Sequence, residues 1–377
     1  MKSFFLILLS FLGSIQVALA AEEWERAIEP RDWQFPRDHG AHPDFKTEWW
    51  YFTGNLQSDD PNQKGDFGYQ LTIFRQGIFR HPQQTQSQQK SQWALHDLFF
   101  GHFTMSDLRK GKFLFSEKVD RGALDQAFSR EGKMDVKLRE WKIQALTPPP
   151  HESYRLSASE ADRSLDLIVT AEKPLILEGD RGLSHKGPEA GNASYYYSYP
   201  RLRTEGSLRI GDRVIPVHGE SWFDHEFSTS SLGPDQIGWD WFSLQLSNHE
   251  ELMLYCMRKK DGSYDLTSAG SWIDTNGQKS DLHQNDFSIQ ILSHWKSSAT
   301  GGLYPSKWRI LIPSKKLVLI ISPRLADQEL RLSELGNLSY WEGASAGEGT
   351  LDGNAIQALG YVELTGYTGS LERGLKK

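Results

Sequence analysis

The sequence contains almost no cysteine. Cys256 is the single cysteine among 377 residues, and one thiol cannot form a disulfide within its own chain. Its neighbours in the segment ELMLYCMR are mostly apolar, which favours a small buried side chain over a reactive nucleophile. The fold must therefore be stabilised by burial of apolar surface and not by covalent cross-links.

The sequence also lacks an excess of positive charge. Its 42 Lys and Arg residues are outnumbered by 49 Asp and Glu residues, which gives a formal net charge of −7. No stretch gathers lysines and arginines into a basic stripe. Because nucleic-acid binding needs such a stripe to neutralise phosphates, we expect no nucleic acid among the partners.

Long apolar runs are missing, with one exception at the start of the chain. Lys2 is followed by the apolar residues 4–18 and by the small-residue sequence Ala-Leu-Ala, which is the layout of a cleaved secretory signal peptide at residues 1–20. The alternative is an uncleaved membrane anchor, for which this run is short. We therefore expect an exported protein, which in a bacterium means a periplasmic one.

Helical periodicity is scarce, whereas alternation of apolar and polar residues is common. The best helical pattern is Ser116–Arg130, SEKVDRGALDQAFSR, which predicts a helix. Period-two alternation, which is typical of strands, recurs from Trp49 onward in FGYQLTIFR, KWRILIPSKKLVLIIS and GYVELTGY. The sequence therefore predicts an all-β protein.

A weak internal repeat predicts two related β-units. The segment WWYFTGNL aligns with WDWFSLQL at an offset of 190 residues (239 − 49), which suits a duplicated domain better than a solenoid. We expect domains at residues 21–232 and 233–377, each a barrel or a sandwich, and a small barrel has room for one apolar ligand. Each copy continues to an arginine, Arg75 or Arg258, that would stack on a ring at the barrel base.

The segment TEWWYFTGNL places four aromatic rings in a row. We expect it to form an early strand in which alternate rings have different tasks, because successive side chains of a strand point to opposite faces. Some rings would fill the barrel base, and others would line a junction with the DHEF and WDW segments. Trp49 and Tyr51 are candidates for binding an apolar ligand.

The densest polar cluster lies in HGESWFDHEF and is followed closely by GWDWF. We identify Asp224, His225 and Asp240 as candidate catalytic residues, because apolar surroundings can raise the pKa of an aspartate until it acts as an acid near neutrality. The alternative is that the segment leaves the sheet and its polar side chains bond loop backbone. The candidate ligand-binding residues here are Trp222, Trp239 and Trp241.

A third group of polar residues precedes the aromatic strand, in DHGAHPDFKTEWWY. His39, His42 and Glu48 lie close together in sequence, but their spacing matches no zinc signature, and a proline follows the second histidine. We therefore predict no metal site. His39 and Glu48 are instead expected to anchor the surroundings of the aromatic strand and to contribute to ligand binding.

Several motifs together resemble one protein family. The segments HGAHPDFKTEWWYFTGNL, HGESWFDHEF, GWDWFSLQL, YWEGASAGEG and GYVELTGY are similar to those of the AttH/CrtC family of exported lipocalin-like proteins, which includes carotenoid 1,2-hydratases. This resemblance spans nearly the whole chain after residue 20. It implies two lipocalin-like antiparallel β-barrel domains side by side. It also implies that other members are encoded with ABC-transporter permeases.

The resemblance implies two functions that need no cofactor. The first is binding or delivery of an apolar lipid or isoprenoid-type ligand, either alone or together with an inner-membrane ABC-transporter permease. The alternative is a carotenoid 1,2-hydratase-like enzyme that adds water to an isoprenoid double bond. There Asp224 or Asp240 would donate the proton, the tryptophans would stabilise the cation and His225 would orient water. A purely structural role in a transporter complex is a third hypothesis.

Overall fold

The structure is a computed structural model that describes residues 24–61, 64–79, 96–148, 151–230, 232–334 and 338–369. The predicted signal peptide at residues 1–20 lies outside these ranges. Within them, no helix is long and apolar enough to cross a membrane. The helical elements described are two short 3-10 turns, Arg37–His39 and Pro313–Lys315.

The first antiparallel sheet contains thirteen strands. Eleven of them follow the order β4-β3-β2-β1-β13-β12-β9-β8-β7-β6-β5, and β10 and β11 pair with β12. The strands are β1 (Thr47–Ser58), β2 (Asp66–Gly77), β3 (Asp97–Asp107), β4 (Lys112–Arg121), β5 (Ala127–Ser129), β6 (Asp135–Leu138), β7 (Trp141–Thr147), β8 (Ser153–Ser159), β9 (Arg163–Ala171), β10 (Ile176–Leu177), β11 (Leu183–His185), β12 (Ala193–Ile210) and β13 (Arg213–Ser228).

The second antiparallel sheet contains ten strands. Nine follow the order β17-β16-β15-β14-β23-β22-β20-β19-β18, and β21 pairs with β22. The strands are β14 (Gln236–Leu246), β15 (Glu251–Lys259), β16 (Ala269–Ile273), β17 (Lys279–His283), β18 (Ser288–Lys296), β19 (Leu303–Ile312), β20 (Leu317–Pro323), β21 (Glu329–Leu332), β22 (Leu338–Leu351) and β23 (Asn354–Leu364).

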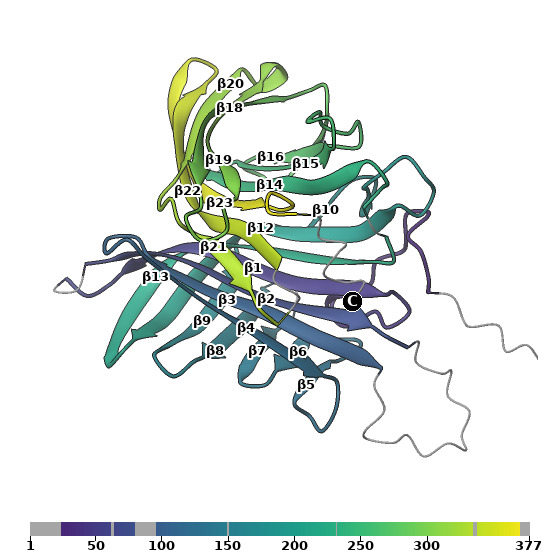
Figure 1. Cartoon of the computed structure of the whole chain (residues 1–377), viewed down its shortest axis with the longest axis vertical. Helices are drawn as coiled ribbons and strands as arrows, with labels where there is room; N and C mark the ends of the chain where they lie inside the picture. Colours follow the sequence, from purple (N-terminus) through teal and green to yellow (C-terminus); the bar gives the residue numbers. More distant parts are fainter. Residues whose placement is uncertain are drawn as a thin grey trace, which may run out of the picture.

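Each sheet curls around its own core, and the two lie against each other (Figure 1). The first is a nearly closed barrel, because β6 near one end of the strand order contacts β2, β3 and β4 near the other. The second is a half-barrel. The two meet where β1 contacts β23, β2 contacts β22 and β12 contacts β14. The predicted all-β class with two lipocalin-like barrels side by side is confirmed.

Alternation along the strands divides the side chains between these cores and the junction. In β1, Trp50 and Phe52 lie in the core of the first barrel, whereas Tyr51 lies in the junction cluster and Trp49 packs against it. The expectation that neighbouring rings of TEWWYF have different tasks is confirmed. In β14, Phe242 lies in the second core and faces away from the junction. Both faces of these central strands are therefore buried.

The internal repeat corresponds to a structural equivalence between β1 and β14. In both strands the first aligned rings, Trp49 and Trp239, pack on the junction cluster. We expected each aligned arginine to stack on a ring at the barrel base. Neither arginine stacks on its aligned tryptophan. Arg75 instead pairs with Glu48 and Asp97, and Arg258 pairs with Asp240 and lies over the ring of Tyr367.

The division into domains at residue 232 stays a prediction, although the chain changes sheets between β13 and β14.

The predicted helix at Ser116–Arg130 is wrong. Residues 112–121 form β4 and pair along their whole length with β3, and residues 127–129 form β5. Pairing with neighbouring strands overrides the weak local preference for a helix. Gly122 interrupts the helical pattern and lies in the turn after β4.

Candidate functional site

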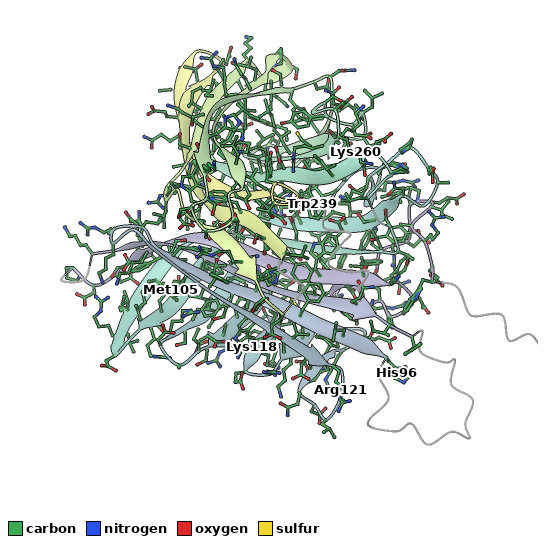
Figure 2. The ribbon with its side chains drawn as sticks, viewed as in Figure 1. His96, Met105, Lys118, Arg121, Trp239 and Lys260 are labelled. Atoms are coloured by element: carbon green, nitrogen blue, oxygen red, sulfur yellow. The ribbon has the colours of Figure 1, made fainter. Side chains whose placement is uncertain are left out.

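The junction between the two sheets is lined by aromatic rings from both. Tyr51, Tyr196 and Trp222 come from the first sheet, and Trp241 and Tyr255 come from the second. Trp241 makes edge contacts with Tyr51 and Trp222, with ring centroids 5.3 and 6.3 Å apart. Figure 2 shows Trp239 where the two sheets meet. Cross-strand aromatic packing therefore holds the two barrels together.

Asp224 is the central polar group of this junction. It lies on β13 and is 4% exposed. Its carboxyl group accepts hydrogen bonds from the Ser198 hydroxyl at 2.6 Å, the Trp222 indole at 2.7 Å and the Tyr196 hydroxyl at 2.8 Å. Burial raises the pKa of Asp224 to about 8, against the opposing effect of these three donors. The group is therefore largely protonated at neutral pH and can donate a proton.

Glu178, which directly follows β10, forms a pair with Asp224. The Ser198 hydroxyl donates to Asp224 and lies close enough to Glu178 to act on its pKa, and Ser271 of the second sheet donates to Glu178 Oε2 at 2.7 Å. Burial raises the pKa of Glu178 to about 7. Its Oε1 is buried and has no hydrogen-bond partner among the described residues. A buried carboxyl oxygen in that state is suited to holding water or a substrate group.

A second pair of acids lies beside Tyr51. Glu342 of β22 and Glu363 of β23 are directly opposite each other in register. The Tyr51 hydroxyl donates to Glu342 Oε1, and the Trp239 indole donates to Glu363 Oε2 at 3.2 Å. Burial raises the pKa of Glu363 to about 7, and burial together with the charge of Glu363 raises the pKa of Glu342 well above its ordinary value.

Lys186 provides a cationic group in the same junction. Its Nζ atom lies 3.0 Å from Glu226 Oε1, 4.4 Å from the ring centre of Tyr255 and 5.0 Å from that of Tyr196. Burial acts to lower the pKa of Lys186, but Glu226, Tyr255 and Asp224 together outweigh it and the pKa is raised. The junction therefore already stabilises a positive charge between a carboxylate and aromatic faces.

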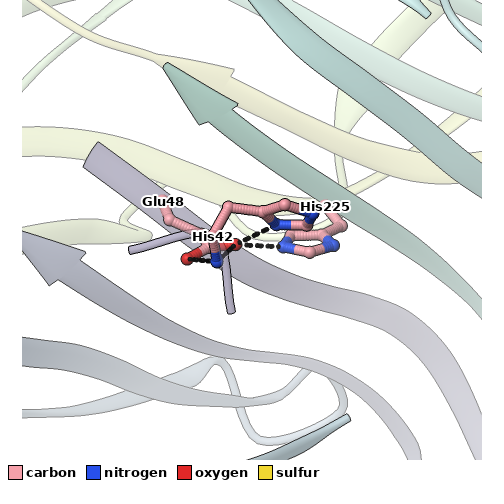
Figure 3. Close-up of side chains that lie close together, drawn as sticks. All are labelled: His42, Glu48 and His225. Atoms are coloured by element: carbon pink, nitrogen blue, oxygen red, sulfur yellow. Dashed lines mark hydrogen bonds and ion pairs between the residues drawn. The ribbon is translucent and has the colours of Figure 1, made fainter. Parts of the chain in front are cut away.

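His225 lies on the opposite face of β13, inside the first barrel. Its Nε2 atom is 3.0 Å from Glu48 Oε1, and its Nδ1 atom is 2.9 Å from the Tyr197 hydroxyl. His42 reaches the same Glu48 oxygen through Nδ1 at 2.8 Å, as Figure 3 shows. Burial lowers the pKa of His225 to about 4, although Glu48 opposes this effect.

Glu48 and His39 belong to this barrel cluster. Burial acts to raise the pKa of Glu48, but His225, His42 and Arg75 together hold it far below the ordinary value. His39 contacts Tyr197 Oη through Nδ1 at 2.7 Å and Glu152 Oε1 through Nε2 at 2.8 Å. A continuous hydrogen-bonded chain therefore connects His39 to Glu48 through Tyr197 and His225.

Asp240 lies in the second barrel, away from both other candidates. It accepts hydrogen bonds from Arg258 Nε at 2.8 Å and from the Tyr367 hydroxyl at 2.9 Å. Burial raises the pKa of Asp240 to about 6, with Arg258 opposing it.

The structure thus places Asp224, His225 and Asp240 in three different environments. It brings together Asp224, Trp222, Trp241, Tyr51 and, at the edge of the junction, Trp49 and Trp239.

Two hollows on the surface lie elsewhere. One of about 360 Å³ is lined by Lys64, Arg109 and Arg213 among others, and one of about 320 Å³ by Glu250, Trp272 and Lys316 among others. None of the candidate site residues lines either hollow.

The sequence matches the AttH-like family over residues 26–367. The chain belongs to this family. The family resemblance that its motifs indicated is therefore confirmed.

Solved structures similar to this AttH-like chain share its fold. A crystal structure from Nitrosomonas europaea assigned as AttH is 35% identical, covers 91% of this chain and 99% of its own, and has a TM-score of 0.78. Kievitone hydratase from Nectria haematococca is 15% identical, with coverage of 92% and 97% and a TM-score of 0.67. At that identity the second likeness concerns the fold alone.

One curated relative is an enzyme. The dehydratase asqC from Emericella nidulans is 23% identical over 228 residues, which are 59% of this chain and 64% of that protein. The match therefore spans less than two thirds of that relative's length.

The sequence analysis did not identify four acids and a lysine that lie in the junction between the two sheets. Glu342 and Glu363 stand in the motifs YWEGASAGEG and GYVELTGY, so the family signal already included them. Glu226 stands in DHEF, next to Asp224 and His225. Glu178 and Lys186 follow very short strands, and no local pattern distinguishes them from ordinary loop residues.

Proposed function

We propose that this protein is a cofactor-free lyase that adds water to, or removes it from, an unsaturated apolar substrate held in the junction. The observation that carries this proposal is Asp224, a buried carboxyl group with a pKa raised to about 8 among aromatic rings. Such a group donates a proton at neutral pH without any metal or cofactor. The name of the dehydratase asqC supports the same class of reaction.

In the hydration direction, Asp224 donates its proton to one carbon of the double bond. The resulting carbocation lies beside the faces of Trp222 and Trp241, whose negative potential stabilises it. Water then attacks the cation, and Glu178 Oε1 accepts the proton that this water loses. Ser198 bonds Asp224 and lies close to Glu178, so its hydroxyl can return the proton from Glu178 to Asp224. Dehydration is the reverse of these steps.

The carrier function, export to the periplasm and a permease partner are separate from the proposed reaction. A carrier of an apolar lipid or isoprenoid-type ligand would use the same ring-lined junction but would not need a protonated Asp224. Export to the periplasm follows from the pattern of residues 1–20, and a permease partner follows from the family resemblance. Both remain proposals.

Asp224→Asn tests the enzyme proposal, with Asp240→Asn as a matched control. Both variants remove one buried carboxyl group with a raised pKa, but Asp240 lies in the second barrel. Wild-type protein is incubated with an acyclic carotenoid or with kievitone in isotopically labelled water, and the products are analysed by mass spectrometry.

We expect labelled alcohol from the wild type and from Asp240→Asn, and a loss of about 100-fold or more in Asp224→Asn. Ligand uptake, followed by quenching of tryptophan fluorescence, should persist in all three. Uptake without any product from the wild type would overturn the enzyme proposal in favour of a carrier.

A further inference from the structure

The cluster inside the first barrel has the geometry of a metal site. His42 Nδ1, Glu48 Oε1 and His225 Nε2 all lie within 4.8 Å of one another. The two contacts made by the Glu48 oxygen measure 2.8 and 3.0 Å. Ligands held about 2.0–2.1 Å from a tetrahedral zinc ion are about 3.3 Å apart, so a small movement outward would admit the ion.

Each of these three side chains is oriented by an outer partner. His42 Nε2 faces Asp38 Oδ1 at 3.3 Å, and His225 Nδ1 faces the Tyr197 hydroxyl at 2.9 Å. Glu48 Oε2 accepts from Arg75 Nε at 3.0 Å, and the backbone N–H of His42 donates to both carboxylate oxygens, at 3.1 Å to Oε1 and 3.0 Å to Oε2. These bonds hold the carboxylate with Oε1 toward the two imidazoles. Metal-binding histidines and carboxylates are usually held by such partners on the atom that does not bind the metal.

We propose that His42, Glu48 and His225 form a binding site for a divalent transition-metal ion, with zinc as the best match. Two imidazoles and one carboxylate suit zinc and related ions, and three protein ligands leave a coordination position for water. The site lies on the opposite face of β13 from Asp224, so it does not depend on the proposed hydration chemistry.

Packing and charge around the cluster are compatible with an ion. The ring of Trp50 stacks on His225, and the ring of Phe227 stacks on His42 at a centroid distance of 3.6 Å. Arg75 is paired with Asp97 as well as with Glu48, so its charge is compensated. The His42 side chain is 10% exposed, whereas that of His225 is fully buried, so His42 marks the side from which an ion can enter.

Zinc and cobalt binding to the full chain test this proposal. Protein is stripped with a chelator, incubated with zinc, dialysed and analysed for bound metal by mass spectrometry. Cobalt supplies a second readout, because its visible absorption reports the geometry of its ligands. The variants are Glu48→Gln and His42→Gln. His102→Gln is the control, since His102 is also a buried histidine but contacts Tyr340 outside the cluster.

We expect one zinc ion per chain in the wild type and in His102→Gln, and at least a tenfold weaker affinity in both cluster variants. If Glu48→Gln does not fold, His42→Gln at the more exposed edge gives the same information. Two results would overturn the proposal: no retained zinc in the wild type, which would make the cluster a hydrogen-bonded core network, or equal retention by all variants, which would place the ion elsewhere.

Discussion

Asp224 and His225 are consecutive residues of β13, yet their side chains lie on opposite sides of the first sheet. Asp224 bonds Tyr196 and Trp222 in the junction between the sheets, and His225 bonds Glu48 and Tyr197 inside the barrel. Two neighbouring residues therefore serve two separate polar sites, and a substitution at one need not disturb the chemistry of the other.

The proposed reaction should have a narrow pH optimum. Asp224, with a pKa of about 8, must be protonated, and Glu178, with a pKa of about 7, must be ionised. The rate should therefore fall above about pH 8, where Asp224 loses its proton, and below about pH 7, where Glu178 gains one. The measurement is product formation against pH. In Glu178→Gln the rate should be lower and the acidic limb should disappear, and an unchanged limb would remove Glu178 from the mechanism.

Asp224→Asn should stabilise the protein relative to the wild type by an amount that grows as the pH rises. Between the ordinary value of 3.8 and the folded value of about 8, the folded state holds a proton that the unfolded chain has released. Stability is therefore full below pH 3.8 and decreases as the pH rises toward 8. Asn does not titrate, so the difference in Tm between variant and wild type should grow by a few degrees over this range.

Asp240→Asn is the control for this stability effect. The folded pKa of Asp240 is about 6, so its Tm difference from the wild type should stop growing near pH 6. Differential scanning calorimetry at several pH values measures both variants. Equal slopes up to pH 8 for the two variants would contradict the assignment of the higher pKa to Asp224.

Tyr51→Phe should destabilise the junction. The Tyr51 hydroxyl donates to Glu342 Oε1, and Glu342 Oε2 already lacks a hydrogen-bond partner among the described residues. Losing this donor leaves a buried carboxyl group poorly satisfied, so the free energy of unfolding should fall by about 1–3 kcal/mol. Urea denaturation measures the change. Tyr195→Phe, which loses a bond to the backbone oxygen of Glu29, should cost less, and equal costs would contradict this role of Tyr51.

Some of the candidate site could be predicted because it follows from strand geometry. Because successive side chains of a strand point to opposite faces, Trp222 and Asp224 share one face of β13 and His225 lies on the other. The absence of a metal site was predicted from the spacing of His39 and His42. That argument used only neighbours in sequence, whereas His225 reaches Glu48 from a strand 177 residues later.

The sequence by itself determined the all-β class, the two-residue alternation of the strands and the family, because these depend on local backbone geometry and on motifs readable along the chain. Only the tertiary structure decided what each face meets. Glu178 and Glu342 come from segments far from Asp224 in the chain, and their pKa values are raised chiefly by burial. Burial is a property of the packed molecule, since it depends on which other strands cover a side chain.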